Sequence, residues 1–308
     1  MPPHPIPPPT ASGATRSTDH PLYWCKYGPA GEPLLLVLHG GPGAHHDYLL
    51  PQMLELTAAA DGRALLFYDQ RGGGKSKTHD QQTITWQTQV GDLAAVIAEF
   101  ALVDPILVGY SWGGLLALLY ASQAAHDASI PAPGPLVLID PAPISRRYRD
   151  QFEREFDRRQ KSPEVERLRA ELAASNLRER DPDAYRQRNF ELSVAGYFAD
   201  PRSAQDLTPF RVTARVQQSV WEGLGDFDLA ADGRLASIRS RALIVHGRQD
   251  PIPLASSENA AKILGATLMV LDNCGHVPYV EQPSALFAAI DSFLRDVSRA
   301  GAANRVAS

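Results

Sequence analysis

Apolar residues occur in short, uninterrupted runs along most of the chain. These runs cover residues 34–38, 64–68, 106–108, 136–139, 242–246 and 267–271. They lack the alternation of apolar and polar positions that is typical of a strand with one solvated face, so they indicate strands that are buried on both sides. Sheets made of such strands are usually parallel and carry helices on both faces.

Segments with helical spacing separate these runs. Residues 112–125 are apolar nearly all round, which predicts a buried helix. Near the C-terminus, Leu286, Ile290 and Phe293 recur at helical spacing and predict a helix with one core-facing stripe. Alternation of strands and helices predicts an α/β fold with a doubly wound, mostly parallel sheet.

The alternation stops between residues 142 and 225. Charged residues are dense here, and four prolines divide the stretch into short helical segments: Pro163, Pro182, Pro201 and Pro209. Mixed charges around an apolar stripe are typical of solvated helices. We therefore predict a core formed by residues 18–141 and 226–300, a helical cap at 142–225, a proline-rich disordered tail at 1–17 and a flexible tail at 301–308.

Charge and composition narrow the class of protein. The formal net charge is −5, which argues against a nucleic-acid partner because such proteins usually present a basic face. No apolar stretch has the length of a membrane helix, and the first residues do not resemble a secretory signal. The two cysteines, Cys25 and Cys274, favour reduced thiols over a disulfide framework. These features predict a cytoplasmic protein with no membrane partner, and they make no prediction of oligomeric state.

A candidate nucleophile lies where the third of these strands meets the buried helix. The sequence GYSWG at 109–113 is a GxSxG motif, and it holds Ser111 on a tight strand-to-helix turn. Small residues beside the serine let the strand and the helix approach, and the positive end of the helix faces the oxyanion that forms during acyl transfer. The alternative is a glycine-rich turn with a structural serine.

A serine nucleophile needs a base and a group that orients the base. Asp250 follows the strand at 242–246, and His276 follows the strand at 267–271. Both are expected at the carboxyl edge of the sheet, where ligands bind in such folds, and their order matches the Ser, acid, His order of α/β-hydrolases. Asp140, which ends the strand at 136–139, is the alternative candidate for the acid.

The sequence HGGPG at 39–43 follows the first strand and offers a backbone N–H to a substrate carbonyl oxygen. We assign the predicted oxyanion hole to the N–H groups of Gly41 and Trp112. The run GGGKS at 72–76 lacks the first glycine of a phosphate loop, because Asp69 occupies that position. The histidines show no metal-ligand spacing. We predict no cofactor and no metal.

Four motifs together point to a family. HGGPG at 39–43, HDYL at 46–49, DQRGGGKS at 69–76 and GYSWGG at 109–114 resemble the prolyl aminopeptidases, also called proline iminopeptidases, and the related tricorn-associated aminopeptidases. The resemblance covers residues 34–121 and 242–283 and is loose through the cap. It implies an α/β-hydrolase fold and a cytoplasmic exopeptidase that releases an N-terminal residue from a short peptide.

In that family acidic residues hold the free amino group of the substrate. The stretch Trp221-Glu222-Gly223 is similar to a part of the cap that carries such a glutamate, so the resemblance implies Glu222 as a substrate-binding residue, with Glu191 as a second candidate. Some members have a second acidic residue directly after the catalytic aspartate, where this chain has Pro251.

Three functions follow from these features. The preferred one is a serine hydrolase of aminopeptidase type that acts on a short peptide or another small molecule. The alternative is a carboxylesterase that uses the same Ser111, His276 and Asp250. A non-catalytic binding protein on this fold is the third, and it is disfavoured because each of the three residues is present.

Overall fold

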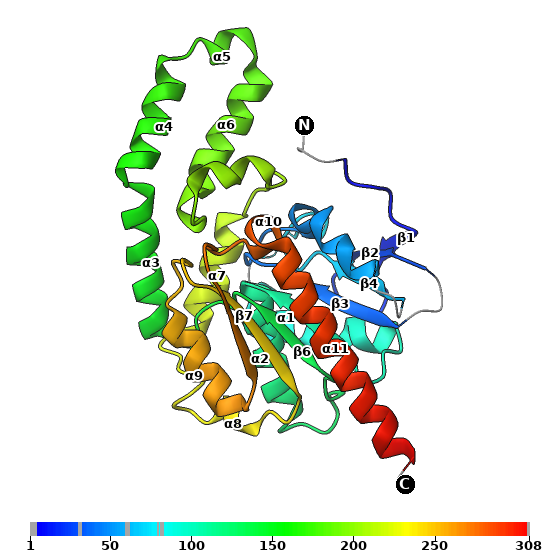
Figure 1. Ribbon diagram of the computed structural model, residues 1–308. Helices are drawn as coiled ribbons and strands as arrows, with labels where there is room; N and C mark the ends of the chain where they lie inside the picture. The colour runs from blue at the N-terminus through cyan, green and yellow to red at the C-terminus, as the bar shows by residue number, and fades with distance from the viewer. Residues whose placement is uncertain (1–4, 30–32, 59–61, 79, 81–82, 307–308) are drawn as a thin grey trace.

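An eight-stranded sheet forms the centre of the molecule in the computed structural model, which describes residues 5–29, 33–58, 62–78, 80 and 83–306 (Figure 1). The order of the strands across the sheet is β1-β2-β4-β3-β5-β6-β7-β8. The pairs β1–β2 and β2–β4 are antiparallel, and the other five pairs are parallel. The strands are β1 (Ala11–Ala14), β2 (Tyr23–Tyr27), β3 (Leu34–Leu38), β4 (Ala64–Tyr68), β5 (Ile106–Tyr110), β6 (Leu136–Ile139), β7 (Ala242–Gly247) and β8 (Thr267–Leu271).

The six apolar runs coincide with the six parallel strands, so the predicted fold class is confirmed. The prediction of a disordered tail over residues 1–17 is wrong from residue 10 onwards. Thr10 N donates to Lys26 O at 2.9 Å, and β1 then pairs with β2 at the edge of the sheet. The prolines end at Pro9, and the small residues that follow leave their N–H groups free to form a ladder. Residues 1–4 lie outside the described part.

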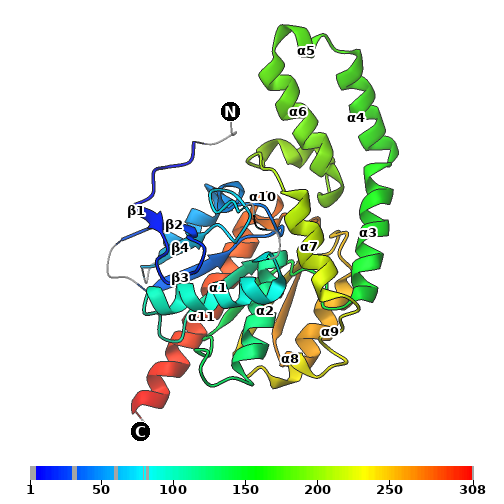
Figure 2. The same cartoon turned by 180° about the vertical axis from the view of Figure 1, so that it is seen from behind.

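Helices cover both faces of the sheet (Figures 1 and 2). One face packs against α1 (Trp86–Glu99), α2 (Trp112–Ala124), α8 (Arg234–Ser237) and α9 (Leu254–Leu264). The other face packs against α11 (Pro283–Val306) and the short 3-10 helix η2 (Gln52–Thr57). Burial on both sides explains why the strands read as continuous apolar runs.

The last helix, α11, continues well beyond its core-facing stripe. Leu286 and Ile290 are fully buried and anchor its first turns. The helix runs to Val306, so the prediction of a flexible tail from residue 301 is wrong for residues 301–306. After Gly301 the sequence returns to good helix formers with no proline to stop it. Residues 307–308 are not described.

Between β6 and β7 the chain leaves the sheet and forms an arm of helices above its carboxyl edge (Figure 1). The helices are α3 (Arg146–Gln160), α4 (Pro163–Ala174), α5 (Leu177–Arg180), α6 (Pro182–Val194), η4 (Ala195–Tyr197), η5 (Pro201–Asp206) and α7 (Ala214–Leu224). Pro163, Pro182 and Pro201 each stand at the first turn of a helix, where their missing N–H costs nothing. The limits of the cap at 142 and 225 stay a prediction.

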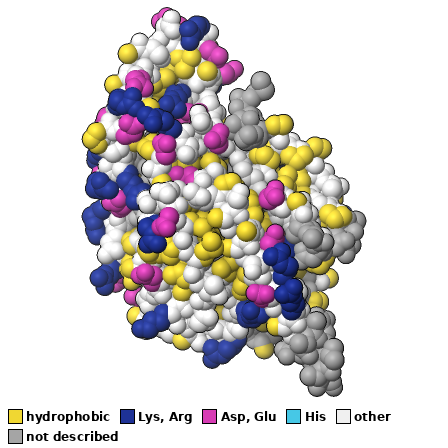
Figure 3. Space-filling view, viewed as in Figure 1, with side chains coloured by type: hydrophobic (Ala, Val, Ile, Leu, Met, Phe, Trp, Pro, Cys, Tyr) yellow, Lys and Arg dark blue, Asp and Glu magenta, His cyan; other side chains and the backbone are white. Residues whose placement is uncertain are grey.

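Acidic and basic side chains are interspersed over this arm (Figure 3). Many pair one turn apart on the same helix, as Lys161 does with Asp157 at 2.7 Å and Arg169 with Glu166 at 2.6 Å. Such exposed pairs each add at most about 1 kcal/mol to stability. The mixture agrees with a solvated helix surface. None of the described helices combines the length and the apolar character needed to cross a bilayer.

Candidate active site

Ser111 lies at the junction of β5 and α2 with a backbone φ of +53°. Few residues other than glycine adopt this left-handed conformation, and such strain clusters at functional sites. The turn is tight: a Cβ at Gly109 would meet Gly113 O at 2.4 Å, and a Cβ at Gly113 would meet Leu38 O at 2.1 Å. The two glycines of the motif are therefore required by the close approach of strand and helix.

The structure brings Ser111, His276 and Asp250 together in one hydrogen-bonded chain. His276 Nε2 lies 2.9 Å from Ser111 Oγ, and His276 Nδ1 lies 2.8 Å from Asp250 Oδ2. Asp250 Oδ1 accepts a further hydrogen bond from Ile252 N at 2.7 Å. A carboxylate that accepts the Nδ1 proton leaves Nε2 free to accept the serine proton. The arrangement has the geometry that nucleophilic acyl transfer requires.

His276 is held from both sides. Its backbone N–H donates to Tyr197 O at 2.7 Å, and its backbone carbonyl accepts from Tyr110 Oη at 2.9 Å. The ring of Tyr197, which belongs to the arm, stacks on the imidazole with a centroid distance of 5.1 Å. Phe156 packs on the same tyrosine at 4.4 Å. The arm thus covers the imidazole, which is only 4% exposed. Tyr197 could not be identified from the sequence, because an aromatic residue in a helical stretch does not signal a role.

Burial changes the acid–base behaviour of this histidine. It lowers the pKa of His276 from 6.5 to about 4, because the charged imidazolium loses its hydration. The reaction needs the neutral imidazole, and a lowered pKa keeps it neutral to a lower pH. We therefore expect the acid limb of the kcat/KM profile below pH 6.5, the value of a free histidine. A profile measured with an uncharged ester, on protein shown by circular dichroism to stay folded, checks this. A midpoint at or above pH 6.5 contradicts it.

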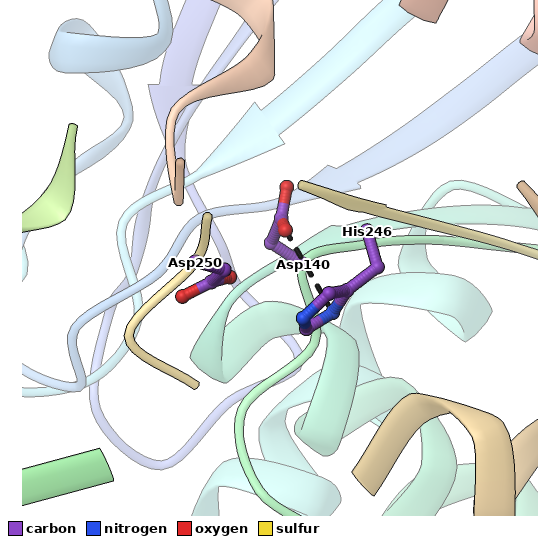
Figure 4. A group of neighbouring side chains, drawn as sticks. All are labelled: Asp140, His246 and Asp250. Atoms are coloured by element: carbon purple, nitrogen blue, oxygen red, sulfur yellow. Dashed lines mark ion pairs between the residues drawn. The ribbon is translucent and has the colours of Figure 1, made fainter. Parts of the chain in front are cut away.

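Asp140, the alternative acid, does not contact the imidazole of His276. It follows β6 and is completely buried, and its Oδ1 accepts a hydrogen bond from Gly247 N at 2.8 Å. It lies between Asp250 and His246, whose Nδ1 is 3.8 Å from Asp140 Oδ1 (Figure 4). Asp250 is therefore the acid that the geometry favours, and Asp140 is its immediate neighbour.

Asp140, His246 and Asp250 form a buried group whose donor atoms lie within 4.8 Å of one another. The hydrogen bonds of this group do not suit a metal ion. His246 Nε2 is 3.1 Å from Ile252 O, and its Nδ1 is 3.0 Å from Ser257 Oγ, so both ring nitrogens are engaged. Metal binding would break at least one of these contacts.

Gly41 and Trp112, the predicted oxyanion hole, belong to the two loops that flank Ser111. Neither backbone N–H donates to an acceptor within the described part of the chain, so both are available to a substrate oxygen. The neighbouring Gly40 N–H is engaged, since it donates to Tyr48 Oη at 2.7 Å. Gly41 has a φ of +129°, a conformation suited to glycine. The oxyanion assignment stays a prediction.

The other two motifs of the N-terminal half brace this loop. Gln70 donates two hydrogen bonds to His39: its backbone N donates to Nε2 at 3.0 Å, and its side-chain Nε2 donates to the carbonyl oxygen at 2.8 Å. Asp69 accepts from His46 Nδ1 at 2.7 Å and from Lys75 N at 2.8 Å. The motif at 69–76 therefore supports the HGGPG loop, and the His39 side chain is part of these contacts.

The two acidic candidates for amine binding differ in burial. Glu222 is exposed on α7 and accepts a hydrogen bond from Gln218 Nε2 at 2.7 Å. Glu191 is 7% exposed on α6 and forms an ion pair with Arg188 at 2.5 Å. The structure does not join either carboxylate to the hydrogen-bonded chain of Ser111. Trp221, next to Glu222, packs its ring on Trp112 at 5.3 Å.

A serine, a histidine and an aspartate joined at the carboxyl edge of a doubly wound sheet are typical of hydrolases with an α/β architecture. Comparison with known proteins agrees with this class. Residues 35–290 match the alpha/beta hydrolase family, and the chain belongs to that family. It is therefore a hydrolase.

Proteins similar to this chain include proline iminopeptidases and an esterase. The proline iminopeptidase of Lactobacillus crispatus (strain ST1) is 29% identical over 268 residues, which cover 80% of this chain and 85% of that protein. The crystal structure of the proline iminopeptidase of Mycobacterium smegmatis superimposes with a TM-score of 0.66 at 22% identity, over 94% of this chain and 100% of that chain. An esterase from Exiguobacterium antarcticum gives a TM-score of 0.61 at 22% identity, over 91% and 98% of the two chains. At such identities the two superpositions establish the shared fold.

Proposed function

We propose that this chain is an aminopeptidase of the proline iminopeptidase type, which releases an N-terminal residue from a short peptide through an acyl-enzyme on Ser111. The observation that carries the proposal is the hydrogen-bonded chain of Ser111, His276 and Asp250, with links of 2.9 and 2.8 Å. The relatives named proline iminopeptidase and the four motifs shared with that family support the peptidase assignment. A cytoplasmic location stays a prediction.

The reaction follows from the positions of the side chains. Ser111 Oγ attacks the substrate carbonyl while His276 Nε2 takes its proton. Asp250 accepts the hydrogen bond from Nδ1 and stabilises the imidazolium that forms. The N–H groups of Gly41 and Trp112 bind the oxyanion. His276 then protonates the leaving amine, and a water molecule hydrolyses the acyl-enzyme by the same steps in reverse order.

A panel of paired substrates tests the peptidase assignment. Proline 4-nitroanilide carries a free amino group, its N-acetylated counterpart does not, and a short-chain nitrophenyl ester needs no amine recognition. We expect cleavage of the free-amine anilide and a lower kcat/KM, by at least about tenfold, for the blocked one, because the blocked substrate has no ammonium group to pair with a carboxylate of the site. Ester turnover with neither anilide cleaved would overturn the assignment in favour of the carboxylesterase.

Glu222 has a limited effect in this proposal. An exposed carboxylate stays hydrated and contributes at most about 1 kcal/mol to an ion pair, so Glu222→Gln is expected to lower kcat/KM for the free-amine anilide by no more than about fivefold. Glu191→Gln is the matched change at the buried candidate. Assays of both variants with the anilide and the ester separate amine binding from general damage. A loss far above fivefold in Glu222→Gln, confined to the anilide, would contradict this limit.

A further inference from the structure

Asp140 is a strained, buried carboxyl group for which the proposed mechanism has no use. Its φ is +41°, a left-handed conformation at the end of β6 that parallels the one at Ser111 on the next strand. Its backbone N–H donates to Val245 O at 2.8 Å, and Gly247 N donates to its Oδ1 at the same distance. Strain of this kind persists only where surrounding contacts fix it, and it often marks a functional position.

No cation neutralises this carboxyl group within the described residues. Two histidines lie near it, His246 and His276, but burial lowers the pKa of each to about 4, so both rings are neutral at pH 7. His246 Nε2 faces a carbonyl, Ile252 O, and therefore carries the ring proton. Its Nδ1 then accepts from Ser257 Oγ and has no proton to offer Asp140. An ionised, fully buried carboxylate without a cation is too costly to persist.

Asp140 lies next to another carboxyl group, that of Asp250. Asp140 Oδ2 is buried, and no N–H or O–H group of the described residues donates to it. One oxygen of each carboxyl group lies within 4.8 Å of the other, and the two groups interact by a hydrogen bond, although neither is a donor when ionised. A single proton shared by the two groups removes one of the two buried charges and supplies the missing donor.

The surroundings decide which carboxyl group holds this proton. Asp250 accepts hydrogen bonds from Ile252 N and from His276 Nδ1, and the guanidinium of Arg159 on α3 favours its ionised form. Glu281 on α10 (Pro278–Glu281) opposes ionisation of Asp250, but its carboxylate is engaged by the N–H groups of Ala199 and Gly275. Burial raises the pKa of both carboxyl groups, and the negative neighbour Asp250 raises that of Asp140 further.

We infer that Asp140 is a positioning residue: its carboxyl group is protonated at neutral pH and donates a hydrogen bond to Asp250, which fixes the carboxylate in the orientation that His276 requires. The inference rests on the proposed role of Asp250. It assigns one negative charge and one proton to the pair, so that Asp250 has three donors and stays ionised without contact with water. It also explains why both carboxyl groups lie at neighbouring strand ends.

Two substitutions separate this role from a structural one. Asp140→Asn keeps the acceptor for Gly247 N and replaces the O–H donor with an N–H donor, so kcat is expected to stay within about threefold of the original protein. Asp140→Ala removes the donor, and the loss of a hydrogen bond to a charged group is expected to lower kcat by about 10- to 100-fold with KM changed less than about threefold. Thermal melts establish that both variants are folded.

An infrared spectrum reads the proton directly and needs no substrate. At pH 7 the difference between the original protein and Asp140→Asn should contain the C=O band of a neutral carboxylic acid, which shifts in D₂O. Absence of that band overturns the inference, as does an Asp140→Ala variant with unchanged kcat. A loss in Asp140→Asn as large as that in Asp250→Asn also overturns it, because Asp140 would then act as an ionised acid. If the band is present but the original protein cleaves neither amides nor esters, the proposed function fails while the protonated Asp140 stands.

Discussion

Replacement of Ser111 by alanine is expected to lower kcat by a factor on the order of 10⁶, the loss seen when a nucleophile that acts as a unit with its base is removed. Without the hydroxyl group no acyl-enzyme forms, and neither His276 nor the oxyanion donors can compensate. The fold should survive, since alanine and serine bear similar strain at a φ of +53°. Steady-state kinetics with the most active substrate of the panel measure the loss.

Ser122→Ala, on the helix α2 that begins directly after Ser111, is the matched control for that experiment. Ser122 is buried on α2, at a distance from the carboxyl edge of the sheet, and its substitution should leave kcat unchanged within about twofold. Activity retained by Ser111→Ala, after contamination is excluded by mass spectrometry, would mean that another residue is the nucleophile.

Asp250→Asn has the second largest expected effect, a loss of about 10⁴ in kcat. The amide has nearly the same shape as the carboxylate, but where its NH₂ group faces Nδ1 it cannot accept a proton there. The imidazole then holds its proton on Nε2, which faces Ser111 and must be free to act as the base. Kinetics of Asp250→Asn and Asp140→Asn under the same conditions measure this effect. Equal activity of Asp250→Asn and the original protein would exclude Asp250 as the acid.

Much of the fold could be predicted from the sequence because its parallel strands are buried on both faces. Such strands are apolar throughout and stand out from the amphipathic helices around them. The two antiparallel strands β1 and β2 were missed because neither is a continuous apolar run. β1 consists of Ala11, Ser12, Gly13 and Ala14, which have low strand propensity, and its pairing is decided by the backbone of β2.

The three residues of the candidate site could be predicted because each follows a strand of the parallel sheet. Ser111, Asp250 and His276 each follow a parallel strand, and parallel strands bring such positions to a common edge. The environment of the site was not predictable, since Tyr197 reaches His276 through the fold of the arm. The position of Asp140 next to Asp250 was not predictable either. It follows from the pairing of β6 with β7, which cannot be read from the sequence.

The account depends most on Ser111 being an activated nucleophile within the chain Ser111–His276–Asp250. Reaction with a fluorophosphonate, followed by peptide mass spectrometry, tests this most directly, because the reagent modifies activated serines whatever the natural substrate is. The account predicts one adduct, on Ser111, whose formation is slowed by several orders of magnitude in His276→Ala. An adduct on another residue, or an unchanged rate in His276→Ala, would contradict it.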